Sequence, residues 1–187
     1  MKLLRKVWLF TKTPAYSPLD HTPYTLKLRI TVALLKWGLL LGLCFGLFNT
    51  WFLGMLNIDL GPHAMDKLLK TYSTYALLFL SVVLAPIIEE CLFRGPLVWF
   101  RNKTYFKYAL YFSIVLFALV HLSNFELYGK VYYIAPLLVG PQLILGIILG
   151  YVRVRLGLSW SIGLHASYNA ILVLPLLLSK LANIPLA

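Results

Sequence analysis

Residues 72–95 read YSTYALLFLSVVLAPIIEECLFRG, and this stretch indicates the class of protein to which the chain belongs. Its apolar run begins at Tyr72 and ends on two adjacent carboxylates, Glu89 and Glu90. A helix needs about 20 mainly apolar residues to cross about 30 Å of hydrocarbon, because each residue adds about 1.5 Å. We therefore interpret the stretch as a membrane-spanning helix that carries acidic side chains near one end.

The whole chain has the composition of a membrane protein. Of its 187 residues, 60% are hydrophobic and 12% are charged. Soluble domains average about 45–50% apolar and about 25% charged residues, so a soluble fold does not account for this chain. The sequence predicts an all-α fold, a polytopic transmembrane helix bundle.

Five apolar blocks have the length of a spanning helix. They predict spans at Thr31–Leu53, Tyr72–Phe93, Tyr108–Asn124, Val131–Gly150 and Ser159–Ser179. Together they form one transmembrane domain over residues 31–187, with no room for a second domain.

Residues 1–30 are basic, and we interpret them as a cytoplasmic N-terminal arm. The arm lacks an apolar run followed by a small-residue cleavage site, so we do not read it as a cleaved signal peptide. Its basic residues alternate with large apolar ones such as Leu4 and Trp8, which predicts an arm lying on the membrane surface. The alternative is a disordered basic tail.

The net charge of +11 is distributed unevenly along the chain. Lys and Arg concentrate in alternate gaps between the predicted spans, starting with the arm, as the positive-inside rule requires. This placement favours an orientation signal and membrane lipids as partners over nucleic acid binding. We expect a multi-pass protein with its N-terminus in the cytoplasm and its C-terminus outside.

Charged side chains within a membrane are costly and require partners. Arg94 lies four residues after Glu90, so the two share one helix face and are predicted to pair. Adjacent helical residues point about 100° apart, which leaves Glu89 free to face another neighbour. The alternative is that all three side chains form a buried ion network that only stabilises the bundle.

Two of the four histidines lie within predicted spans. His121 closes the third apolar block, whereas His165 lies in the fifth with Asn169 four residues later on the same face. His21 and His63 lie in polar flanks, where we expect solvated side chains.

The three candidate reactive groups are predicted to lie at one depth. Glu89 is 12 residues before Arg101, His121 is 14 after Lys107, and His165 is 10 after Arg155. These separations correspond to roughly 18, 21 and 15 Å below the cytoplasmic surface. The comparison assumes that the second helix continues through Pro96.

The three motifs EExxxR (89–94), FxxxH (117–121) and HxxxN (165–169) resemble those of the CPBP family, also called the Abi family. This family contains the CAAX prenyl-protein endopeptidases and bacterial relatives linked to bacteriocin processing and self-immunity. The resemblance covers about residues 72–175. It implies an intramembrane endopeptidase of the bacterial plasma membrane that cleaves a prenylated protein or a leader peptide.

The resemblance also implies a role for each motif residue. Glu89 with His121 would activate the attacking water, while His165 and Asn169 would stabilise the oxyanion. Glu90 and Arg94 would hold the base in place, and no cofactor would be needed. Phe117 is expected to pack rather than react.

Two alternatives remain open at this point. Glu89, His121 and His165 are also a ligand set for catalytic zinc, although the HExxH spacing is absent and Cys44 and Cys91 give no metal-binding spacing. The polar network also fits a non-catalytic immunity or scaffold protein that binds a peptide, or a small transporter. No feature of the sequence specifies an oligomeric state.

Overall fold

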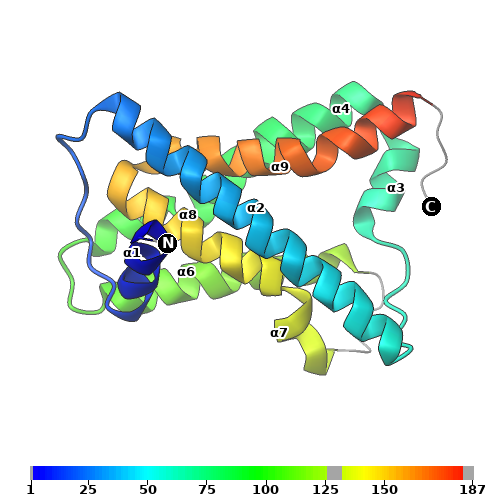
Figure 1. Cartoon of the computed structure of the whole chain (residues 1–187), viewed down its shortest axis with the longest axis horizontal. Helices are drawn as coiled ribbons and strands as arrows, with labels where there is room; N and C mark the ends of the chain where they lie inside the picture. Colours follow the sequence, from blue (N-terminus) through cyan, green and yellow to red (C-terminus); the bar gives the residue numbers. More distant parts are fainter. Residues whose placement is uncertain (1, 126–131, 183–187) are drawn as a thin grey trace.

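The computed structural model describes residues 2–125 and 132–182, and over these residues it is helical, with no strand among them (Figure 1). The elements, in chain order, are α1 (Lys2–Lys12), α2 (Tyr24–Met55), α3 (Ala64–Thr71), α4 (Thr74–Leu78), η1 (Phe79–Leu84), α5 (Ala85–Phe93), η2 (Gly95–Phe100), α6 (Phe106–Val120), η3 (His121–Asn124), η5 (Tyr132–Ile134), α7 (Ala135–Leu138), α8 (Gly140–Leu156) and α9 (Leu158–Leu181).

The helices confirm the predicted polytopic bundle. Four continuous helical segments are long and apolar enough to cross a membrane: Tyr24–Met55, Thr74–Phe100, Phe106–Asn124 and Leu158–Leu181. The remaining span, the fourth in chain order, consists of two helical segments, Tyr132–Leu138 and Gly140–Leu156, which meet at a 49° bend. The predicted start of this span, Val131, lies outside the described residues.

The first span begins at Tyr24 rather than at the predicted Thr31. The extra residues include Lys27 and Arg29, which continue the helix beyond its apolar part. Hydropathy does not detect this extension because the residues are charged, although they are good helix formers. Pro23 precedes the helix, and its backbone angles are not helical.

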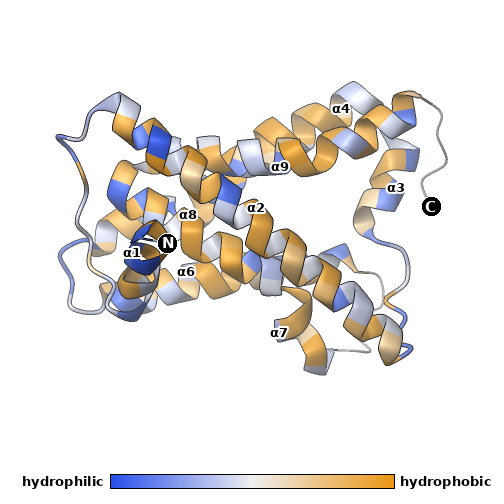
Figure 2. Ribbon diagram, viewed as in Figure 1, coloured by the Kyte–Doolittle hydropathy of each residue, from blue (hydrophilic) through white to orange (hydrophobic). Residues whose placement is uncertain are grey.

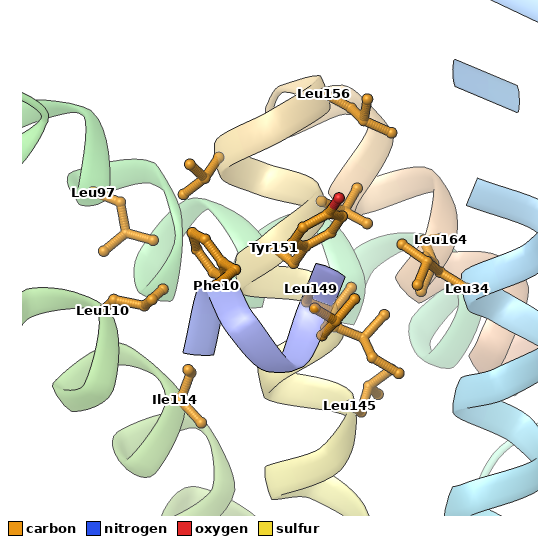
Figure 3. Packing of buried hydrophobic residues seen from close by; sticks show 14 of the residues in the cluster. Phe10, Leu34, Leu97, Leu110, Ile114, Leu145, Leu149, Tyr151, Leu156 and Leu164 are labelled. Atoms are coloured by element: carbon orange, nitrogen blue, oxygen red, sulfur yellow. The ribbon is translucent and has the colours of Figure 1, made fainter. Parts of the chain in front are cut away.

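The N-terminal arm contains a helix that packs against the bundle. α1 buries Val7 and Phe10, and the Phe10 ring meets the Tyr151 ring of α8 edge to face at 5.4 Å (Figure 3). The Tyr111 hydroxyl of α6 donates a hydrogen bond to the Thr11 carbonyl at 2.7 Å. Residues 2–12 are therefore not a disordered tail.

α8 lies at the centre of the bundle, against α2, α6 and α9 (Figure 1). Its glycines allow this close approach. A Cβ atom on Gly146 would lie 3.3–3.4 Å from side-chain atoms of Ile114, Arg94 and Phe117. Gly146 thus leaves room for the buried Arg94 side chain.

Two prolines free backbone carbonyls that asparagines of other helices then bind. Pro141 has no N–H to donate to the Leu137 carbonyl one turn earlier, and Asn49 of α2 donates its Nδ2 to that carbonyl at 2.8 Å. The 49° bend between Tyr132–Leu138 and Gly140–Leu156 lies at this position. The second case, at Pro86, belongs to the candidate site.

Candidate active site

A cavity of about 860 Å³ opens within the bundle, between α2, α3, α5, α8 and α9. It contains side chains from all three motifs. Its polar and titratable lining residues are His63, Asp66, Ser81, Glu89, His121, Asn124, Gln142, His165, Tyr168 and Asn169. This cavity is the candidate active site.

Glu89 and the two membrane histidines meet in this cavity. Glu89 Oε2 lies 4.0 Å from His121 Nε2 and 3.8 Å from His165 Nε2. The depth comparison predicted this convergence. The prediction assumed that the helix continues through Pro96. The α-helix ends at Phe93, but the 3₁₀ helix η2 continues the helical segment from Gly95 to Phe100.

Glu90 points away from the cavity and is fully buried. Its Oε1 lies 3.4 Å from Arg94 Nη1, as the i,i+4 spacing predicts, and 3.1 Å from His165 Nδ1. Its Oε2 accepts a hydrogen bond from the Ser161 hydroxyl at 2.5 Å. Glu90 therefore contacts His165 at Nδ1, and the other ring nitrogen, Nε2, faces Glu89.

Phe117 packs at the centre of the site and carries no reactive group. Its ring lies 3.9 Å from the buried Arg94 guanidinium carbon, and its centroid is 4.8 Å from that of His121 and 5.6 Å from that of His165. A guanidinium over an aromatic face is attracted by the ring quadrupole. Phe117 thus sets the spacing between the arginine and both histidines.

The backbone of the FxxxH motif orients the first histidine. His121 Nδ1 lies 2.7 Å from the Phe117 carbonyl oxygen. A carbonyl only accepts hydrogen bonds, so Nδ1 carries the proton and Nε2 of the neutral ring is an acceptor. By the same reasoning His165 Nδ1 donates to the Glu90 carboxylate.

Asn169 is oriented by a break in helical register. In the π-helix η1 the Ala85 N–H donates to the Leu80 carbonyl, five residues earlier. The next bond of that register would join residue 86 to the Ser81 carbonyl, but Pro86 has no N–H. Asn169 Nδ2 donates to the Ser81 carbonyl instead, at 2.9 Å. The second N–H of this amide is left for another acceptor.

Several polar residues of the site were not anticipated, and three of them bear on its geometry. Ser161 lies four residues before His165 on the same helix face, but its contact with Glu90 depends on packing between helices, which this spacing does not report. Ser81 contributes through its carbonyl, which no side-chain pattern reveals. Gln142 lines the cavity, and its buried Oε1 has no hydrogen-bond partner among the described residues.

The expectation of a solvated His63 was wrong. His63 is half-buried at the cavity rim, where Nδ1 accepts a hydrogen bond from the Met65 N–H and caps α3. Burial lowers the pKa of His63, although Asp66 opposes the shift. The lowered pKa favours the neutral ring, the form that can accept this bond.

No group of three His, Cys, Asp or Glu side chains within residues 2–125 and 132–182 is arranged as a metal site. The Nε2 atoms of His121 and His165 nevertheless both face the Glu89 carboxylate. The three alternative zinc ligands are therefore neighbours, although they are not arranged as a metal site among the described residues.

Comparison with known proteins identifies the family. Residues 71–171, more than half of the chain, match the family model described as type II CAAX prenyl endopeptidase Rce1-like. Neither the curated proteins nor the solved structures gave a match. The chain therefore belongs to this family, which confirms the resemblance that the three motifs predicted.

Proposed function

We propose that this CAAX-type membrane protease hydrolyses a peptide bond with a water molecule that Glu89 activates, without a metal ion. The observation that carries the proposal is the position of Glu89 Oε2, 4.0 Å from His121 Nε2 and 3.8 Å from His165 Nε2. Both separations exceed a hydrogen bond, and Oε2 is buried with no hydrogen-bond partner among the described residues. The three groups are thus placed to act on a molecule between them.

The first step is water attack. A water molecule donates one hydrogen bond to the Glu89 carboxylate and the other to His121 Nε2, which is an acceptor because Nδ1 is bound to the Phe117 carbonyl. Glu89 then takes a proton as the water oxygen bonds to the substrate carbonyl carbon. This is general base catalysis by a positioned carboxylate.

The second step stabilises the oxyanion. Asn169 offers its free amide N–H, since the other is bound to the Ser81 carbonyl. His165 Nε2 is the second donor, on a ring whose Nδ1 lies 3.1 Å from Glu90 Oε1. Each oxyanion donor contributes about 2.7–4 kcal/mol in comparable sites.

The last step breaks the peptide bond. Protonated Glu89 returns its proton to the leaving nitrogen, the C–N bond breaks, and the carbonyl carbon keeps the new oxygen as a carboxylic acid. Glu89 ends in its starting state.

The substrate class follows from the family and the cavity. The family description names a prenyl endopeptidase, which supports a membrane-associated peptide with a lipidated C-terminus as substrate. Apolar side chains such as Met65, Leu145 and Leu172 line the cavity around the polar centre, and they suit an apolar peptide. A leader peptide is the second substrate class, and its cleavage would link the protein to bacteriocin processing or immunity.

The proposal is tested by cleavage of fluorogenic peptides, including prenylated ones, by the full chain in detergent. We compare the wild type with Glu89→Gln and His121→Ala, each with and without a strong chelator. Cys91→Ala is the matched control, because Cys91 is an exposed free thiol on the same helix as Glu89. We expect activity to fall at least about a thousandfold in Glu89→Gln, to survive in Cys91→Ala and to be indifferent to the chelator.

Other outcomes would favour the alternatives. Loss of activity on chelation, restored by zinc, would replace the glutamate mechanism with metal hydrolysis by the same three side chains. Full activity in a folded Glu89→Gln protein would show that Glu89 is not the base. A folded wild type that binds but never cuts these peptides would favour the immunity or scaffold function.

A further inference from the structure

We propose that a second site, the hollow between α1 and the C-terminal end of α8, binds the phosphate-bearing headgroup of an anionic phospholipid. The hollow encloses about 380 Å³ and is separate from the active-site cavity, with which it shares no lining residue. Its walls include Lys6, Leu9, Phe10, Thr13, Leu19 and Arg155. The proposal does not depend on the proposed peptidase mechanism.

The polar wall of the hollow is positively charged, which suits an anionic ligand. Lys6 and Arg155 supply two cations, and no Asp or Glu among the described residues lines the hollow. Arg155 is held in place by hydrogen bonds from Nη1 to Ser17, to its carbonyl oxygen at 2.8 Å and its hydroxyl at 2.5 Å. Arg155 Nε is buried and has no hydrogen-bond partner among the described residues. Buried guanidinium donors of this kind suit a phosphate oxygen.

The rest of the wall is apolar and favours a lipid over free phosphate. Leu9, Phe10 and Leu19 lie beside the cations, so the hollow presents both a charged and an apolar wall. Free phosphate would use only the charged part. A phospholipid places its phosphate on the cations and its glycerol and upper acyl carbons on the apolar side chains.

The position of the hollow also matches a membrane surface. It lies at the end of the molecule where α1, the start of α2 and the connection between η2 and α6 gather their hydrophilic residues (Figures 1 and 2). On α1, Trp8 is 59% exposed and Lys12 lies over its ring at 4.8 Å. Trp and Lys side by side on an amphipathic helix are typical of the lipid headgroup region.

The matched pair Lys6→Ala and Lys12→Ala tests the site. Each removes one positive charge from α1, but only Lys6 lines the hollow. The full chain in neutral detergent is titrated with dioctanoyl phosphatidylglycerol or dioctanoyl phosphatidylcholine, and bound lipid is counted by native mass spectrometry. We expect one saturable phosphatidylglycerol site, with phosphatidylcholine bound far more weakly.

Lys6→Ala should weaken phosphatidylglycerol binding about fivefold, the factor that corresponds to about 1 kcal/mol for one cation near an anionic headgroup. Lys12→Ala should change it by less than about twofold.

Three results would overturn the proposal. Equal weakening by Lys6→Ala and Lys12→Ala would indicate general attraction to a basic helix rather than a site. Equal binding of the two lipids would remove the requirement for an anion. If inorganic phosphate alone displaces phosphatidylglycerol or raises the melting temperature as much, the site takes free phosphate and not a lipid.

Discussion

Arg94 is the residue on which the interior of the site depends, because its charge is buried against two different partners. Its Nη1 lies 3.4 Å from Glu90 Oε1, and its guanidinium carbon lies 3.9 Å from the Phe117 ring centroid. Both Arg94 and Glu90 are fully buried. A buried charge is tolerated only when it is paired, so removing either residue should destabilise the protein by leaving the other charge unpaired.

We predict that Arg94→Met lowers the free energy of unfolding by about 3 kcal/mol, because it leaves the Glu90 carboxylate buried without its cation. Glu90→Gln combined with Arg94→Met should recover much of this loss, since the double variant buries no net charge at the pair. Unfolding of the full chain in mixed micelles measures both. Arg101→Met serves as control, because Arg101 is exposed. An Arg94→Met protein as stable as the wild type would contradict the assignment.

The sequence predicted some of these residues better than others. The Glu90–Arg94 pair follows from its four-residue spacing, because helix geometry alone brings such side chains together. Ser161 has the same spacing to His165, yet serine is common in membrane helices as a helix-to-helix hydrogen-bonding group and its type points to no chemistry. Its contact with Glu90 depends on packing between α5 and α9, which no spacing reports.

At the scale of the element, proline and asparagine act as a pair in two places. Pro141 frees the Leu137 carbonyl, which Asn49 binds, and Pro86 frees the Ser81 carbonyl, which Asn169 binds. In each case the asparagine comes from another helix, so the break in one helix fixes its position relative to the next. The pair at Pro86 also leaves the second amide N–H of Asn169 for another acceptor beside the candidate active-site cavity.

We predict that Pro86→Ala lowers kcat about tenfold without unfolding the protein, a barrier increase of about 1.4 kcal/mol. The new N–H competes with Asn169 for the Ser81 carbonyl, so Asn169 loses its orientation. The double variant Pro86→Ala/Asn169→Ala should have nearly the same kcat as Asn169→Ala alone, because both substitutions act through the Asn169 amide. Peptide cleavage rates measure this.

Pro175→Ala is the matched control for this change, because Pro175 lies inside α9 and does not line the cavity. It should leave kcat within about twofold of the wild type. Full activity in Pro86→Ala would show that the break in register has no part in positioning Asn169.

Hydropathy predicted where helices lie but not their internal register. The block from Tyr72 to Phe93 was expected to be one regular helix, yet it passes through α4, the π-helix η1 and α5. The bend between α7 and α8 was also not predicted from the sequence. Apolar composition reports burial in lipid, whereas register depends on which carbonyls lose a donor and which side chains replace it.

At the scale of the whole molecule, most Lys and Arg residues lie at one end of the bundle, on α1, the start of α2, the connection after η2 and the last turn of α8. The end formed by α1, the start of α2 and the connection after η2 is hydrophilic (Figure 2). The arm was predicted to lie on the membrane, and its packing onto α8 through Val7 and Phe10 became visible only in the structure. An amphipathic sequence alone does not distinguish a lipid surface from a protein surface as the partner of its apolar face.

We predict that this basic end faces the cytoplasm and that the connection between α2 and α3 faces the opposite side, as the positive-inside rule requires. Single cysteines are introduced as Lys103→Cys and Asp59→Cys in a chain whose Cys44 and Cys91 are replaced by serine. Both positions are exposed, and they lie between helices. In intact cells an impermeant thiol reagent should label Asp59→Cys, whereas Lys103→Cys should react only after the membrane is permeabilised. The cysteine-free chain gives the background, and the reverse labelling pattern would place the basic end, and with it the proposed lipid site, on the outer surface.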